Sequence, residues 1–167
     1  EQGVVLLLLG CRLLQGYAIA RPMPAAQVAE WVAGYRPFAD WNFYANAELT
    51  PEQTMIAIRR CDARQWLQRV RDCLYGAGQK PAPAWPIMDR KRTHLGRWLR
   101  QAKQERQYAE DWLERLQQLQ HDLHSQADRL KQRYDAGELA AAQAGFADLQ
   151  ALQQEIDERL ILYTQLP

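Results

Sequence analysis

Few side chains in this 167-residue chain can bind a metal or move a proton, and the informative ones are three histidines and three cysteines. His121 and His124 are three residues apart, so a helix would place both on one face. Together with His94 and Cys61 they supply the nitrogen and sulfur donors that zinc prefers. These four residues are one candidate metal site. The alternative is that His121 is solvated and His124 makes a hydrogen bond in or beside the core.

Other kinds of chemistry have little support. The sequence contains no nucleophile–base pair, phosphate-binding loop or cofactor fingerprint. Arg90-Lys91-Arg92, followed by His94 and Arg97, forms a basic cluster that could contact phosphate, but a solvated helix face explains it more simply. No base-reading motif accompanies the cluster, so we expect no nucleic-acid partner. The odd number of cysteines, at no framework spacing, favours reduced thiols and a cytoplasmic location.

Charge is divided unevenly along the chain. The total of 21 Lys and Arg against 20 Asp and Glu gives a net charge of +1, from which no polyanion partner follows. Residues 51–106 carry 13 basic and 5 acidic side chains, a net of +8, whereas residues 107–167 carry 5 and 11, a net of −6. This division predicts neighbouring helices of complementary charge. The apolar run Val4–Leu9 is too short to cross a bilayer, so we expect no membrane segment.

The elements that would position these residues are helices. Thr50-Pro51-Glu52-Gln53 has the pattern of a capping box and predicts a helix start. Apolar residues then recur at steps of three and four, with Trp66, Trp98 and Trp112 facing the core. Gly76–Pro86 is rich in Gly and Pro and predicts a loop. We expect helices over residues 51–75, 89–99 and 105–134 and, after a break at 135–137, from 139 onward. Helices joined by so short a break should be antiparallel, which predicts a four-helix bundle.

The first 50 residues have a different pattern. Val4–Leu9 predicts the end of a helix closed by Gly10, and Leu13–Tyr17 predicts a short buried strand. Pro24 suits the first turn of a helix that runs through Tyr35. Residues 36–49 are irregular and rich in aromatic residues, so we expect a linker that packs down instead of floating free.

Two stretches of this region carry a family resemblance: Leu9-Gly10-Cys11-Arg12-Leu13-Leu14-Gln15-Gly16-Tyr17, then Arg21-Pro22-Met23-Pro24. They resemble the C-terminal end of EAL-type cyclic-di-GMP phosphodiesterases, in which a helix ends in Leu-Gly-Cys and a strand leads into Gln-Gly-Tyr. The resemblance covers residues 1–35. It implies a helix–strand–helix remnant of a TIM-type (β/α) barrel, and the chain is then expected to be the C-terminal part of a longer protein.

The same resemblance implies that most of an EAL active site lies elsewhere. The family's metal-binding carboxylates, catalytic lysine and Glu-Ala-Leu motif all precede this stretch, and only Gln15 maps close to the substrate. Two divalent metal ions activate water in a complete EAL domain, and residues 1–35 offer only Glu1 and Glu30 as carboxylates. We therefore expect no catalytic residue in this segment, no cofactor, cyclic-di-GMP binding only through the missing barrel, and no hydrolysis by this chain alone.

Three later stretches carry a second resemblance: Ala63-Arg64-Gln65-Trp66, Thr93-His94-Leu95-Gly96-Arg97-Trp98-Leu99 and Gln120-His121-Asp122-Leu123-His124. They resemble the chemoreceptor zinc-binding (CZB) domain, a four-helix bundle with the patterns His-x-x-Trp, Cys-x-Phe/Leu-Gly-x-Trp and His-x-x-x-His. The resemblance covers about residues 51–166. The family's four zinc ligands fall on Ala63, Thr93, Gln120 and His124, and only His124 binds zinc well. The resemblance therefore implies a degenerate bundle that no longer binds zinc.

The alternative metal site made of His94, His121, His124 and Cys61 fits this frame poorly. His94 is one position away from the family's ligand position, which turns it about 100° around a helix. Cys61 is two positions away. The sequence thus favours a bundle without a metal.

These inferences combine into a mainly α protein with an EAL-like fragment at 1–35, a linker at 36–49 and a CZB-like four-helix bundle at 50–167. The expected function is that of a regulatory or dimerisation part of a bacterial cyclic-di-GMP signalling protein, a cytoplasmic homodimer whose bundle modulates an EAL domain. Two alternatives stay open. The chain is part of an active cyclic-di-GMP phosphodiesterase, or it is a free-standing helical interaction module.

Overall fold

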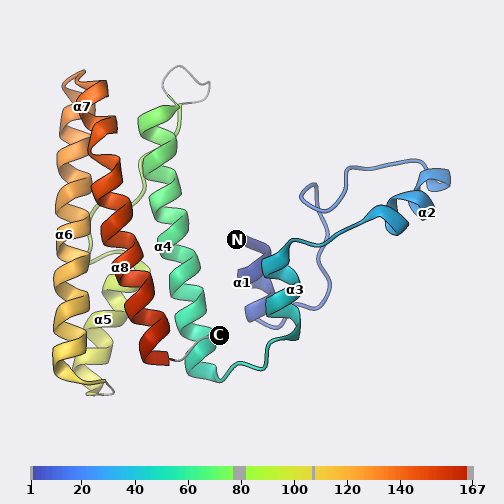
Figure 1. The fold of residues 1–167 in the computed structure, drawn as a ribbon, viewed down its shortest axis with the longest axis horizontal. Helices are drawn as coiled ribbons and strands as arrows, with labels where there is room; N and C mark the ends of the chain where they lie inside the picture. The colour runs from blue at the N-terminus through green and yellow to red at the C-terminus, as the bar shows by residue number, and fades with distance from the viewer. Residues whose placement is uncertain (1, 77–81, 107, 165–167) are drawn as a thin grey trace. The chain divides into compact units, whose positions relative to one another are not determined.

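The computed structural model describes residues 2–76, 82–106 and 108–164, and these residues are mainly α-helical (Figure 1). The chain divides into two compact units, Glu1–Thr54 and Met55–Pro167, each of which is described by itself. Part of the predicted loop at Gly76–Pro86, residues 77–81, lies outside the described residues. No helix among the described residues has both the length and the apolar character needed to cross a membrane.

The first unit contains three short helices: α1 (Gln2–Leu8), α2 (Ala25–Gly34) and α3 (Ala39–Asn46). The predicted end of the first helix is confirmed, because Gly10 has a positive φ of 88° and the amides of Gly10 and Cys11 bond to the carbonyls of Leu7 and Leu6. These two hydrogen bonds form a Schellman motif. α1 packs on α3, where Gly3 lies directly against the indole of Trp41.

The predicted buried strand at Leu13–Tyr17 is wrong. Residues 11–15 have no regular secondary structure, and Leu13 and Tyr17 are 94% and 77% exposed. A strand must pair its backbone groups with a second strand, and the described part of the chain contains none. The prediction of an irregular linker at 36–49 also needs correction, because α3 occupies the middle of it.

The second unit begins within α4 (Pro51–Tyr75). The predicted capping box at the start of this helix is confirmed: the Gln53 amide donates to Thr50 Oγ1 at 3.2 Å, and the Thr50 amide donates to Gln53 Oε1 at 2.9 Å. These bonds satisfy two backbone donors that a helix start would otherwise leave unpaired.

The next helix is α5 (His94–Glu105), and it begins five residues later than the sequence predicts. Residues 89–92 form a turn, in which the Arg92 amide bonds to the Asp89 carbonyl and the Lys91 amide bonds to the Asp89 carboxylate. The Asp89 side chain thus competes with helix formation, as short polar side chains do. The helix that follows begins later than predicted as well, after Arg106, which has a left-handed φ of 51°.

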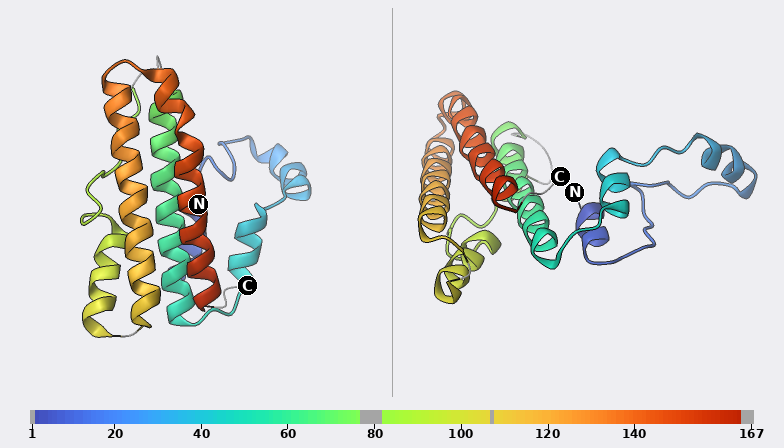
Figure 2. Two further views of the ribbon diagram at one scale, coloured as in Figure 1. Left: turned by 60° about the vertical axis from the view of Figure 1, so that its left-hand side comes forward. Right: turned by 60° about the horizontal axis from the view of Figure 1, so that its bottom comes forward.

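The bundle is completed by α6 (Glu110–Asp135), α7 (Leu139–Ala144) and α8 (Phe146–Thr164). The break predicted at Asp135-Ala136-Gly137 is confirmed, with Gly137 at φ 81°. The chain reverses there, so that α8 runs alongside α6 and α4 (Figures 1 and 2). The predicted last helix is divided at Gly145, and α7 covers its first turns.

The core of this unit follows the predicted apolar stripes. The buried side chains of α6 and α8 include Leu116, Leu119, Leu123, Ala127, Leu130, Leu149, Ile156 and Leu160. The basic and acidic parts of the chain also meet as predicted. Arg60 on α4 makes two hydrogen bonds with Asp157 on α8, at 2.7 and 3.0 Å, and Lys103 on α5 lies 3.6 Å from Glu114 on α6.

Candidate functional site

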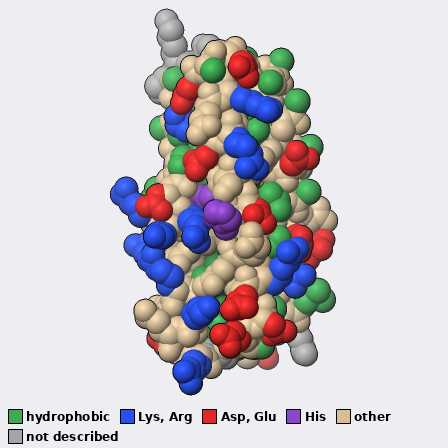
Figure 3. Space-filling model, turned by 90° about the vertical axis from the view of Figure 1, so that its left-hand side faces the viewer, with side chains coloured by type: hydrophobic (Ala, Val, Ile, Leu, Met, Phe, Trp, Pro, Cys, Tyr) green, Lys and Arg blue, Asp and Glu red, His purple; other side chains and the backbone are tan. Residues whose placement is uncertain are grey.

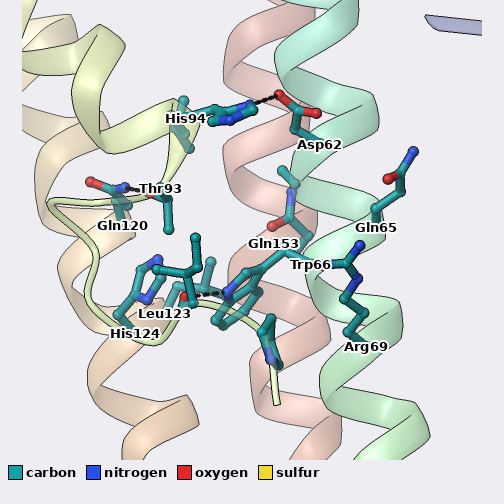
Figure 4. A pocket seen from close by; sticks show the side chains of 14 residues that line it. Asp62, Gln65, Trp66, Arg69, Thr93, His94, Gln120, Leu123, His124 and Gln153 are labelled. Carbon is teal, nitrogen blue, oxygen red and sulfur yellow. Dashed lines mark hydrogen bonds and ion pairs between the residues drawn. The ribbon is translucent and has the colours of Figure 1, made fainter. Parts of the chain in front are cut away.

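A cavity of about 240 Å³ lies midway along the bundle, lined by α4, α6, α8 and the start of α5 (Figure 4). All four positions that the CZB resemblance assigns to zinc ligands line it: Ala63, Thr93, Gln120 and His124. Residues up to 61 positions apart in the sequence thus meet at one site, as the resemblance predicts. What these side chains do there decides whether they can hold a metal.

Thr93 is the N-cap of α5, and its hydroxyl is fully occupied. It donates to the Arg90 carbonyl at 2.8 Å and accepts from the Gly96 amide at 3.1 Å and from Gln120 Nε2 at 3.1 Å. A hydroxyl offers one donor and two acceptor sites, so no lone pair is left for a ligand. Threonine at this position therefore serves the helix start.

Gln120 closes the site from α6. Its side chain is 2% exposed, and Nε2 donates to Thr93 Oγ1 and, at 3.4 Å, to the Arg90 carbonyl. Two of the four vestigial ligand positions are thus bonded to each other. Gly96 makes this close approach possible, because a Cβ there would run into the Arg90 carbonyl oxygen and come within 2.8 Å of Gln120 Nε2.

His124 lies deeper in the same wall and is 5% exposed. Its Nδ1 is 2.8 Å from the Met88 carbonyl oxygen, which can only accept a hydrogen bond, so Nδ1 carries the proton. Burial lowers the pKa of His124, against the opposing effects of the Met88 hydrogen bond and of Asp128. The ring is therefore neutral at pH 7, with Nε2 as an acceptor.

Trp66 forms the apolar wall on α4. Its indole Nε1 donates to the Ile87 carbonyl at 2.8 Å, and its ring lies 4.7 Å from the His124 ring, centroid to centroid. Trp66 is therefore held by a hydrogen bond and a ring contact at the same time. Trp66 was predicted to pack in the core, but it is only half-buried and lines the cavity. The interpretation that His124 makes a hydrogen bond beside the core is confirmed.

Gln153 lines the cavity, although the sequence motifs did not assign it to a site. Gln153 on α8 is 4% exposed, and neither its Nε2 nor its Oε1 has a hydrogen-bond partner among the described residues. Figure 4 shows its side chain between Asp62 and Trp66. The signal was present in the sequence, because Gln153 stands on the apolar stripe of Leu149, Ile156 and Leu160, where a glutamine is out of place.

The charged residues of the site lie at its rim. His94 Nδ1 is 2.8 Å from Asp62 Oδ2, and the His94 side chain is 54% exposed. Arg59 lies 3.7 Å from the same carboxylate oxygen. Arg69 also lines the cavity. The buried side chains of the wall, Gln120, His124 and Gln153, are uncharged at pH 7, whereas the rim carries Arg59 and Arg69 against the single carboxylate of Asp62.

The alternative metal site of His94, His121, His124 and Cys61 is not assembled. His94 and His124 line the cavity, but His121 is exposed on α6 and neither His121 nor Cys61 is part of the lining. Over residues 2–76, 82–106 and 108–164, no three His, Cys, Asp or Glu side chains are grouped as metal ligands would be. The set Ala63, Thr93, Gln120 and His124 does not fit zinc either, because a methyl, an occupied hydroxyl and an amide replace three of its donors.

Two other predicted residues or clusters lie away from the cavity. Gln15 is exposed on the irregular segment of the first unit. Arg90-Lys91-Arg92 forms part of the turn before α5, so the prediction of a helix face is wrong, because the Asp89 side chain bonds to the backbone there. Figure 3 shows basic side chains gathered beside the histidines on one face of the bundle.

The cavity therefore combines a bonded Thr93–Gln120 pair, a neutral His124, the indole of Trp66 and an unpaired Gln153 amide. This arrangement does not offer the set of nitrogen and sulfur donors that a zinc site needs. A scan against family models, a search of curated proteins and a search of solved structures each found no match to this chain.

Proposed function

We propose that this chain is the regulatory part of a bacterial cyclic-di-GMP signalling protein, in which the helical bundle of residues 50–167 modulates an EAL phosphodiesterase domain and no longer binds zinc. The observation that carries the proposal is the convergence of Ala63, Thr93, Gln120 and His124 on one cavity. The residues that the CZB resemblance singled out over three separate stretches are neighbours in space, and the metal donors among them are replaced by a hydrogen-bonded pair and a methyl group.

Regulation follows if a molecule bound in the cavity changes the packing of the bundle. α4 contacts the other helices through Trp66 against His124 at the cavity and through Arg60 against Asp157 elsewhere. A molecule that binds one arrangement of these side chains better than another shifts the population between them. The bundle would pass such a shift to the domain that it joins.

The state of the first unit supports its role as part of a larger domain. Among its described residues only Gly3 and Val4 are buried, and it exposes Leu9, Leu13 and Tyr17. Exposed apolar side chains in such numbers mark a surface that packs against something else. An EAL barrel is the domain that the sequence resemblance favours.

The zinc part of the proposal is tested by restoring the missing donors. The unmodified chain should purify without tightly held zinc. The triple variant Ala63→His, Thr93→Cys, Gln120→His should bind one zinc ion through these side chains and His124, because thiolate and imidazole donors would then meet at one site. Cobalt absorbance of the tetrahedral site and metal analysis would detect it. Adding His124→Ala should weaken the binding sharply.

Stoichiometric zinc in the unmodified chain would contradict the proposal. A folded triple variant that binds no zinc would contradict the CZB resemblance itself.

The signalling part is tested by enzyme assay. The chain alone should not hydrolyse cyclic-di-GMP, and turnover would overturn the assignment. In a longer polypeptide that carries the barrel, deletion of residues 50–167 should change the hydrolysis rate, whereas an unchanged rate would exclude a regulatory bundle. Light scattering after size-exclusion chromatography tests the expected homodimer, and a monomer at micromolar concentration would exclude it.

A further inference from the structure

We propose that the cavity binds a small aromatic hydroxy acid as a single anion, with its hydroxyl at His124 on the inner wall and its carboxylate at Arg69 on the rim. The inference rests on the proposed regulatory role, for which it names the class of signal. Its test reads binding alone, so its failure is distinguishable from failure of the regulatory proposal.

The unpaired ring nitrogen of His124 is the first argument. The side chain is 5% exposed, and its Nδ1 hydrogen is already bonded to the Met88 carbonyl. Nε2 has no hydrogen-bond partner among the residues that the structure describes, yet it keeps exposed surface that the amide atoms of Gln153 lack. Burial lowers the pKa of the ring, so Nε2 is an acceptor at pH 7. An occupant with an O–H group supplies the donor that this nitrogen lacks.

The charge of the rim is the second argument. Asp62 is shared by His94 and Arg59, at 2.8 and 3.7 Å. Arg69 lines the same cavity and forms no ion pair in the described part of the chain. Asp72, one turn further along α4, instead accepts a hydrogen bond from a glutamine of the same helix at 2.7 Å. Two guanidinium groups against one carboxylate leave the rim with an excess positive charge, which favours an occupant with one negative charge.

The size and walls of the cavity are the third argument. About 240 Å³ is below the roughly 300–1,000 Å³ typical of sites for drug-sized ligands, so the occupant is small. Trp66 lies 4.7 Å from His124, ring centroid to centroid, and one turn of α4 before Arg69, so its indole lies between the two polar positions (Figure 4). Leu123 adds to the apolar lining. An aromatic ring can pack on this surface while its polar groups stay at opposite edges.

The experiment uses the full chain and two probes, 4-hydroxybenzoate and 3-hydroxybenzoate, which differ in the separation of hydroxyl and carboxylate. Nuclear magnetic resonance follows the indole N–H of Trp66 and the ring nitrogens of His124. At least one probe should shift both signals with a dissociation constant below about 1 mM.

Two analogues of the better probe each lack one polar group. Benzoate lacks the hydroxyl and should bind about three- to tenfold more weakly, because His124 Nε2 then stays unpaired. The matching hydroxybenzamide lacks the charge and should bind about two- to fivefold more weakly. This second difference should shrink in about 0.5 M salt, because Arg69 is exposed to solvent.

Matched variants assign the preference for the anion. Arg69→Gln should remove the preference for the hydroxybenzoate over the hydroxybenzamide, since the guanidinium is its source. Arg71→Gln removes the same charge from an exposed position of α4 outside the cavity and should keep the preference. Ala63→Leu fills the cavity from α4 and should abolish binding. Both arginines are exposed, so their variants should fold even if Ala63→Leu does not.

Five results would overturn the inference. These are no shift with either hydroxybenzoate up to about 10 mM, equal binding of benzoate, equal binding of the hydroxybenzamide, a preference for the anion that survives Arg69→Gln, or binding that survives in a folded Ala63→Leu variant.

Discussion

His124 shows how a single buried side chain ties stability to pH. Burial depresses its pKa from the ordinary value of 6.5, so the folded protein binds a proton less readily than the unfolded chain. Unfolding then takes up protons as the pH falls below about 6.5, and the free energy of unfolding decreases in the same direction. The stability that neutral His124 supplies is complete above this pH and is lost progressively below it.

We therefore expect His124→Asn to flatten the pH dependence of stability between about pH 7 and pH 5. Each unit of depression in the pKa corresponds to about 1.4 kcal/mol, and Asp128 and Asp89 oppose part of it. Urea unfolding at a series of pH values measures the effect. His121→Asn, at the exposed histidine of the same helix, should leave the pH slope unchanged. If the free energy of unfolding changes with pH equally in the unmodified chain and in His124→Asn, burial of His124 does not cause the pH dependence.

Gly96 shows how one missing methyl group permits a contact. Alanine is a better helix former than glycine by about 1 kcal/mol, yet a Cβ at position 96 would collide with the Arg90 carbonyl and with Gln120. We expect Gly96→Ala to destabilise the bundle by about 1–3 kcal/mol in chemical unfolding. Gly34→Ala, in α2 where a Cβ meets nothing within 4 Å, should be neutral or stabilising. A stabilising Gly96→Ala would show that α5 can move away from Gln120.

At the scale of elements, α8 makes two ion pairs that differ in burial. Comparing them separates the effect of burial on stability from the effect of charge. Asp157 makes two hydrogen bonds with Arg60 on α4, and their side chains are only 23% and 11% exposed. Glu155 bonds to Arg115 on α6 at 2.7 Å, but these side chains are 37% and 47% exposed. Solvent screens the second pair much more than the first.

Asp157→Asn should therefore destabilise the bundle by about 1–3 kcal/mol, because a partly buried guanidinium loses its counter-charge. Glu155→Gln should cost less than about 1 kcal/mol. Both changes remove one negative charge from the same helix. The two variants therefore have equal net charge, and a difference between them reflects the burial of the pair. The free energy of unfolding is measured in urea at one ionic strength. Equal losses in the two variants would contradict the expectation that the less exposed pair contributes more.

The elements were predictable where the apolar pattern is long. The stripes of α6 and α8 and the Thr50–Gln53 capping box all followed from spacing, because helix periodicity and capping are local properties of the sequence. The start of α5 was not predictable, because the choice between helix and turn at Asp89 depends on one side-chain hydrogen bond. The strand at Leu13–Tyr17 was predicted wrongly, because a strand depends on a partner that a local pattern cannot supply.

The site was predictable only in its positions. Family spacing pointed to Ala63, Thr93, Gln120 and His124, and all four line the cavity. The hydrogen bond from Gln120 to Thr93 and the unpaired amide of Gln153 could not be read from spacing, because both depend on how side chains of different helices meet. A glutamine on an apolar stripe was the only local sign.

At the scale of the whole molecule, the core belongs almost entirely to one unit. Every buried apolar side chain among the described residues except Val4 lies in the second unit. A fragment of residues 48–167 retains the capping box and this core. We expect it to unfold cooperatively with a Tm within about 4 °C of the full chain, since a change of that size corresponds to about 1 kcal/mol or less.

Circular dichroism during heating measures both halves of this prediction. Residues 1–47 alone should show no cooperative transition, because two buried residues cannot offset the conformational entropy of ordering the unit. A fragment of residues 48–167 that melts without cooperativity would show that the bundle depends on the first unit.

Residues 83–90, which precede α5, bond to the helices mainly through their backbone carbonyls. The carbonyls of Pro83, Ile87, Met88 and Arg90 accept hydrogen bonds from Cys73, Trp66, His124, Thr93 and Gln120. Every residue type has a carbonyl, whereas the donors are specific side chains. Substitutions should therefore accumulate readily at residues 83–88 and 90 of related chains. Asp89, whose carboxylate bonds to the Lys91 amide, and the donor positions on the helices should stay constant or change together.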